Sequence, residues 1–138
     1  MTQKNNPYEG FEVISVYTRA EAITDGTVVD VTQTAKEAGF KLPTVLTRNV
    51  WERCVSVPET VEGQGQSEEG RLWDVLWMAS VAARNARAGE NQVTFKVSVV
   101  DAQRPDGSLH RQEQELWLHI GGGDQGEPVL TIMFPEDY

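Results

Sequence analysis

Hydrophobic and polar positions alternate in the last third of the chain, which is the pattern of a half-buried strand. The apolar positions of the first run are Val93, Phe95, Val97 and Val99. A turn signal follows at Pro105-Asp106-Gly107-Ser108, and residues 116–120 and 130–134 repeat the alternation. The pattern predicts a three-stranded antiparallel meander with one apolar face.

The turn also predicts the register of the first two strands. A hairpin closed with Arg104 opposite Leu109 pairs Val97 with Leu116, Phe95 with Leu118 and Val93 with Ile120. These pairs share one face, and a slip of one residue would break all of them. In the third strand, Leu130, Ile132 and Phe134 are expected opposite Ile120, Leu118 and Leu116.

A helical period replaces the alternation between Ser67 and about Ala86. One apolar stripe consists of Leu72, Val75, Leu76, Ala79 and Ala83, and a second of Trp73, Trp77, Met78 and Val81. A helix that is apolar on two faces has to be covered on both. We expect the first stripe to cover the meander, and Trp73 and Trp77 to pack against helices of the N-terminal half.

Three short helices are predicted in the N-terminal half. Thr18 and Glu21 fit a capping box for the first, which ends before Asp25-Gly26. The second covers residues 33–38, and Thr47 caps the third, which runs to about Val55. Residues 27–31 are expected to form a strand or a buried extended segment, residues 11–17 a short strand or an extended entry to the fold, and residues 1–10 a flexible segment. The elements predict an α+β fold in a single globular domain over residues 11–138.

Composition excludes several classes of function. The chain has 138 residues and a net charge of −9, which disfavours direct binding to nucleic acid or anionic membranes. No apolar run reaches the length that crosses a bilayer, and the N-terminus lacks the apolar segment of a signal peptide. The only cysteine is Cys54, so a reducing cytoplasm is the expected compartment.

Carboxylates gather in two stretches that lack Lys and Arg. One lies between Arg53 and Arg71, and the other follows Arg111. The expected partner-binding acidic face consists of Glu59, Glu62, Glu68, Glu69, Glu113, Glu115, Asp124 and Glu127. Such a face can bind a protein with a basic surface, or it can serve solubility alone.

Motifs for catalysis are weak. Residues 121–126 match G-x-G-x-x-G, but Pro128 and a strand follow instead of a helix, so we expect a hairpin loop and no nucleotide. His110 and His119 belong to no group with metal-ligand spacing, and Cys54 lies on an apolar helix stripe where packing is its expected role. No metal or cofactor is predicted, and the absence of hydrolase and NTPase motifs argues against an enzyme.

One group of residues could bind a ligand. Arg71 and Asp74 are three residues apart on the main helix, where they can form a structural ion pair. Alternatively they join four residues near the starts of the short helices, namely Tyr17, Arg19, Arg48 and Trp51. Arg side chains and helix N-termini together would form a cleft for an anionic small molecule or nucleotide.

The sequence also resembles a known family. The residues that carry the resemblance are 16–23, Asp25-Gly26, 29–31, 37–40, Leu46-Thr47, Val50-Trp51, Cys54 and the run Gly70-Arg71-Leu72-Trp73-Asp74-Val75-Leu76. They are similar to a domain-of-unknown-function family of small bacterial, phage and plasmid proteins, over roughly residues 11–135. The resemblance implies a phage or mobile-element setting and brings no catalytic residues with it.

Two main hypotheses follow. The first is a non-enzymatic accessory protein that acts by protein–protein contact and inhibits a host nucleic-acid-handling defence system by charge mimicry. The alternative is a small enzyme or ligand-binding domain for an anionic molecule that uses the Arg and Asp residues. A third hypothesis is an assembly protein that dimerises through an open sheet edge.

Overall fold

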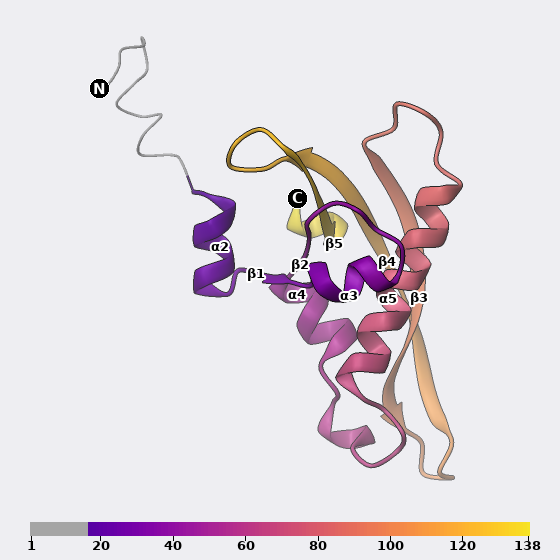
Figure 1. The fold of residues 1–138 in the computed structure, drawn as a ribbon. Coiled ribbons are helices and arrows are strands. Elements are labelled where there is room, and N and C mark those ends of the chain that lie inside the picture. Colours follow the sequence, from indigo (N-terminus) through magenta and orange to yellow (C-terminus); the bar gives the residue numbers. More distant parts are fainter. Residues whose placement is uncertain (1–16) are drawn as a thin grey trace.

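The computed structural model describes residues 17–138. The flexible segment predicted over residues 1–10 and the strand predicted to begin at Phe11 lie outside these residues. Within them, the chain combines helices with one sheet (Figure 1), which confirms the α+β class.

The sheet has five strands, in the order β1-β2-β5-β4-β3. Their bounds are β1 Val28–Asp30, β2 Thr44–Thr47, β3 Gln92–Gln103, β4 Leu109–Gly122 and β5 Pro128–Met133. Neighbouring strands are antiparallel except β2 and β5, which are parallel. The three strands predicted from the alternation are thus part of a larger sheet, which continues through β2 to β1 at one edge.

The register of the β3–β4 hairpin differs from the prediction by two residues. Phe95 lies opposite Leu116 and Val93 opposite Leu118. One residue of the difference arises at the turn, where Gln103 instead of Arg104 lies opposite Leu109, and the other at a bulge between Val100 and Ala102. A shift by two keeps each side chain on its face, so Phe95, Val97, Leu116 and Leu118 are buried as predicted, whereas Ile120 near the end of β4 is 40% exposed. In β5, Leu130 lies opposite Ile120 and Ile132 opposite Leu118, which are the pairs expected.

Short helices and one long helix complete the fold. They are α2 Arg19–Asp25, α3 Thr32–Glu37, α4 Arg48–Val50, the π-helical turn η1 Trp51–Val55, the 3-10 turns η2 Glu59–Val61 and η3 Pro135–Asp137, and α5 Glu68–Arg84. The predicted starts are confirmed: the hydroxyls of Thr18, Thr47 and Ser67 accept hydrogen bonds from the amides of Glu21, Val50 and Gly70. Gly26 ends α2 with φ of 85°, which an L side chain rarely adopts.

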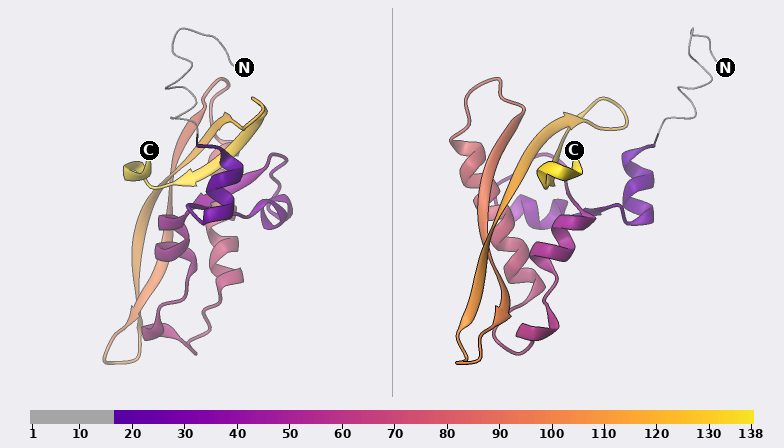
Figure 2. Two further views of the ribbon diagram at one scale, coloured as in Figure 1. Left: turned by 90° about the vertical axis from the view of Figure 1, so that its left-hand side faces the viewer. Right: turned by 180° about the vertical axis from the view of Figure 1, so that it is seen from behind.

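Helix α5 packs along β3, and α2 lies at the β1 side of the molecule, away from β3 (Figures 1 and 2). The core between α5 and the sheet contains Leu72, Val75, Leu76 and Ala79 from the helix, with Phe95, Val97, Leu116 and Leu118 from the strands. None of the helices in residues 17–138 is long and apolar enough to cross a membrane.

The second stripe of α5 is not covered as expected. Trp73 is 37% exposed and Trp77 is 44% exposed, although α3 and the segment after it lie near Trp77. The two indoles stack on each other, with ring centroids 6.0 Å apart. Each indole therefore covers part of the other, and the rest of both rings is exposed to solvent.

Candidate functional site

The Arg71 guanidinium is buried where α5, η1 and the edge strand β3 meet. Only 5% of the residue is exposed. Its Nε donates to the Val55 carbonyl at 3.1 Å, and its Nη1 donates to the Val100 carbonyl at 2.8 Å and to Gln66 Oε1 at 3.1 Å. Three separate segments are held together by one side chain, because the planar guanidinium offers donors in several directions.

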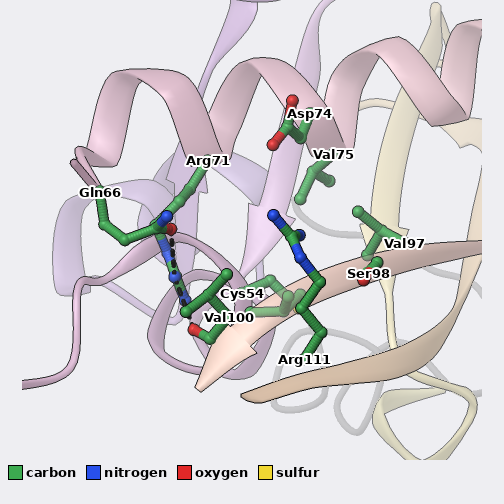
Figure 3. A pocket seen from close by; sticks show the side chains of 10 residues that line it. Cys54, Gln66, Arg71, Asp74, Val75, Val97, Ser98, Val100 and Arg111 are labelled. Atoms are coloured by element: carbon green, nitrogen blue, oxygen red, sulfur yellow. Dashed lines mark hydrogen bonds between the residues drawn. The ribbon is translucent and has the colours of Figure 1, made fainter. Parts of the chain in front are cut away.

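The remaining nitrogen of this group, Nη2, is buried and has no hydrogen-bond partner in the part of the chain that the structure describes. Other atoms of Arg71 help to line a cavity of about 50 Å³, together with Cys54, Gln66, Asp74, Val75, residues 97–100 and Arg111 (Figure 3). Burial lowers the pKa of the Arg71 guanidinium below its usual value, while nearby groups, including the Asp74 and Asp101 carboxylates, act in the opposite direction. The cation is retained because arginine is not deprotonated in proteins.

Cys54 lines the same cavity and has low reactivity. Its side chain is 1% exposed, and burial raises the pKa of the thiol from 9.0 to about 11, against a lowering effect of Arg53 and Arg71. A thiol with this pKa is protonated at neutral pH and is therefore a poor nucleophile. This supports the role in packing expected from its position on an apolar stripe.

The structure divides the six predicted ligand-binding residues among three places. Arg71 and Asp74 line the cavity of Figure 3, but the Arg71 donors go to carbonyl and amide oxygens, and the ion pairs among residues 17–138 do not include one between these two. Trp51 instead lines a hollow with Leu72, β1 and the start of α3. The expected cleft that gathers all six side chains does not form.

Tyr17, Arg19 and Arg48 lie around the third place, beside β1, β2 and β5. The Tyr17 hydroxyl donates to the Asp25 carboxylate, Arg19 Nη2 donates to the Leu130 carbonyl at 3.0 Å, and Arg48 Nε donates to the Gly26 carbonyl at 2.9 Å. Burial lowers the pKa of Arg19, with smaller opposing effects from nearby carboxylates. These contacts join the α2 region to the sheet, so the three residues have structural roles in this arrangement.

The eight residues of the expected acidic face occupy separate parts of the surface. Glu59, Glu62, Glu68 and Glu69 are exposed in η2, the following loop and the first turn of α5. Glu113 and Glu115 are exposed on β4, where Glu113 lies 3.7 Å from the Lys96 amine. In the β4–β5 loop, Asp124 accepts hydrogen bonds from the Arg19 and Ala20 amides, and Glu127 accepts one from the Gln125 amide. Of these residues, Glu69 lies beside an exposed apolar surface, on α5.

That apolar surface is the outer side of α5, which we define by Glu69, Trp73, Asp74 and Trp77. Glu69 precedes Trp73 by four residues and Asp74 precedes Trp77 by three, so each carboxylate neighbours an indole on the helix surface. The Arg84 guanidinium lies over the Trp77 ring at 5.1 Å from its centroid. Sequence reasoning assigned both indoles to the interior. The acidic neighbours and Arg84 on the same side of the helix were the signal that this side faces solvent.

Two other predicted features are plain structural elements. The glycine-rich run closes β4 and β5 as a hairpin loop, as expected, and a strand follows it. Within residues 17–138, no group of three His, Cys, Asp or Glu side chains is placed to hold a metal ion. His110 instead forms a contact with Asp101 at 2.6 Å beside the bulge of β3.

Comparison with known proteins places the chain in a family. Residues 4–138 match DUF6573, a family of unknown function, and the chain belongs to this family. No curated protein and no solved structure matches it.

Proposed function

We propose that this member of DUF6573 is a non-enzymatic accessory protein that binds another protein with a basic surface through the outer side of α5. The observation that carries the proposal is the stacked pair Trp73 and Trp77, which is more than a third exposed on the longest helix of the described residues. Large aromatic side chains are enriched at protein interfaces and supply much of their binding energy.

The chemistry of this surface favours a cationic partner. An indole face attracts Lys and Arg side chains, and the position of Arg84 over Trp77 shows that this ring accepts a guanidinium. Glu69 and Asp74 add negative charge beside the rings, and the net charge of −9 attracts basic proteins over longer distances.

We further propose that the protein is encoded by a phage or mobile element and that its partner is a host nucleic-acid-handling protein. The exposed carboxylates Glu59, Glu62, Glu68 and Glu69 would then face a basic groove that normally binds phosphates. In such a complex, the two tryptophans would supply the apolar part of the interface, and the carboxylates would orient the partner's basic groove.

The proposal is tested with the wild-type protein and the double variant Trp73→Ala/Trp77→Ala, each immobilised and exposed to host lysate at low and high salt. We expect the wild type to retain a basic nucleic-acid-binding protein at low salt, and the double variant to lose it. Ile120→Ala is the matched control, since Ile120 is a large apolar side chain that is 40% exposed but belongs to β4. Equal retention by the double variant, or retention of no basic protein, contradicts the proposal.

The alternative function as a ligand-binding domain is favoured by one observation, the unpartnered nitrogen of Arg71. The cavity that other atoms of Arg71 help to line has a volume of about 50 Å³, which is far smaller than the roughly 300–1,000 Å³ of sites for nucleotide-sized or drug-sized ligands. A nucleotide is therefore not a candidate for this position, and only a ligand of a few atoms fits.

A further inference from the structure

Helix α5 exposes more large apolar side chains than any other element of residues 17–138. Trp73, Trp77 and Met78 are each more than a third exposed, and they lie within six consecutive positions of the helix. Helix α3 packs next to α5 but leaves these side chains uncovered. Neighbouring exposed aromatic side chains on one helix are typical of a contact surface. A partner that brings apolar side chains of its own would complete this surface.

The two ends of the surface carry opposite charge. Glu69 lies in the first turn of α5, and Arg84 is the last residue of the helix. Both are exposed, and the ion pairs among residues 17–138 include neither of them. The Arg84 guanidinium lies over the Trp77 ring, so it is on the same side of the helix as the indoles. The 15 positions from Glu69 to Arg84 span about 22 Å of helix, so these two charges cannot pair within one copy.

A second copy of α5 fits this pattern when the two helices are antiparallel. A two-fold axis beside Trp77 makes the interface self-complementary, because each contact then occurs twice. Glu69 of each copy lies opposite Arg84 of the other, and the four indoles meet between these two ion pairs. Parallel helices would instead place Glu69 against Glu69 and Arg84 against Arg84, and like charges repel. The charges thus favour one orientation, and the indoles supply the apolar contact.

We propose that α5 pairs with α5 of a second copy of this chain in an antiparallel homodimer, with Trp73 and Trp77 of both copies at its centre and Glu69 against Arg84 at its two ends. The indoles also belong to the surface assigned to a basic partner. A second copy therefore covers that surface in the free protein, and the basic partner has to displace it. This competition rests on the proposed function, whereas the dimer itself follows from the exposed residues of α5 alone.

Salt separates the two uses of the surface. Each copy has a net charge of −9, so two copies repel each other at long range, and salt screens this repulsion. Two exposed ion pairs contribute little free energy by comparison. The dimer should therefore become tighter from low to moderate ionic strength, whereas retention of a basic partner should become weaker.

Sedimentation of the purified full chain at moderate salt tests the dimer. We expect the wild type and Ile120→Ala to be dimeric at about 0.1 mM, since a small interface of one helix per copy corresponds to micromolar affinity. Trp73→Ala/Trp77→Ala should be monomeric under the same conditions, with a circular dichroism spectrum that shows a folded chain. A monomeric wild type, or a dimer that survives the loss of both indoles, overturns the proposal.

Charge reversal tests the orientation of the two helices. Glu69→Arg/Arg84→Glu exchanges the two charges and should dimerise as tightly as the wild type. Glu69→Arg/Arg104→Glu has the same net charge, and Arg104 lies in the distant turn between β3 and β4. It leaves arginines opposite each other at both ends of the interface, so its dimer should be about tenfold weaker. Equal dimer affinities of these two variants overturn the antiparallel arrangement.

Retention of basic proteins from host lysate is measured separately, so the two proposals can fail independently. A monomeric wild type that still retains a basic nucleic-acid-binding protein overturns the dimer alone. A wild type that is dimeric and retains no basic protein at any salt concentration overturns the proposed protein contact alone.

Discussion

The Asp124 carboxylate accepts a hydrogen bond of 2.7 Å from the backbone amide of Arg19, although the two residues are 105 positions apart in the chain. A second bond of 3.1 Å comes from the Ala20 amide. The first amides of a helix have no partner within it, and the helix dipole favours negative charge at this end. The glycine-rich loop between β4 and β5 therefore serves to dock α2, and the negative charge of Asp124 is used within the fold.

Asp124→Ala should loosen α2 while leaving the sheet intact. Loss of the two hydrogen bonds is expected to lower the free energy of unfolding by about 1–2 kcal/mol. The Arg19 and Ala20 amides should exchange with solvent faster in the variant, as measured by hydrogen exchange. Gln125→Ala in the same loop should leave both quantities unchanged. Unaltered exchange in Asp124→Ala would mean that the contact is not populated in solution.

Arg71→Met should be strongly destabilising. The substitution leaves the buried carbonyls of Val55 and Val100 without their donors, which predicts a loss of about 2–5 kcal/mol in the free energy of unfolding. Urea denaturation provides the measurement. Arg84→Met on the same helix is the control, since Arg84 is exposed, and it should cost about 1 kcal/mol or less. If the two variants lose equal stability, the buried contacts of Arg71 contribute little.

The two exposed tryptophans should matter little for folding. Trp73→Ala and Trp77→Ala are each expected to cost about 1 kcal/mol, mainly from lost stacking. Leu76→Ala, at a position of 0% exposure on the core side of the same helix, should cost about 2–5 kcal/mol. Denaturation curves of the three variants test this ranking. Tryptophan variants as unstable as Leu76→Ala would place the indoles in the core and remove the basis for a protein-binding surface.

The buried thiol of Cys54 should make the folded state less stable at alkaline pH. Its pKa is raised to about 11 by burial, so the folded state holds the thiol proton more tightly than the unfolded state. This contribution is complete below the unfolded pKa of about 8.5–9 and is lost as pH rises toward 11; in total it is about 2–3 kcal/mol. The free energy of unfolding of the wild type should therefore fall more steeply between pH 9 and 11 than that of Cys54→Ala. Parallel curves would show that the thiol is not desolvated.

Local signals in the sequence were reliable where the chemistry is local. The hydroxyls of Thr18, Thr47 and Ser67 cap the predicted helices because a cap depends on residues two or three positions away. The alternation in β3 predicted the buried face, although the bulge near Val100 moved the register, since a bulge leaves each flanking run of alternation unchanged.

Long-range relationships were not accessible in the same way. The parallel pairing of β2 with β5 joins residues 44–46 to residues 130–132, and nothing in either short apolar run specifies a partner so far along the chain. The tryptophans were assigned to the interior because hydrophobicity alone does not say whether an apolar stripe has a cover. Arg71 likewise binds carbonyl groups of distant segments, whereas helical spacing predicted an ion pair with its neighbour Asp74.

The position of β5 has a consequence for how the chain folds. This strand leaves the ribosome after the other four, yet it is the middle member of the sheet, between β2 and β4. During synthesis, the β1–β2 pair and the β3–β4 hairpin can each form before β5, but the sheet that contains both is completed only when the last strand pairs with β2 and β4. Nascent chains should therefore gain their cooperative stability late and abruptly, and a peptide spanning residues 126–138 should restore the fold to a chain that ends before it.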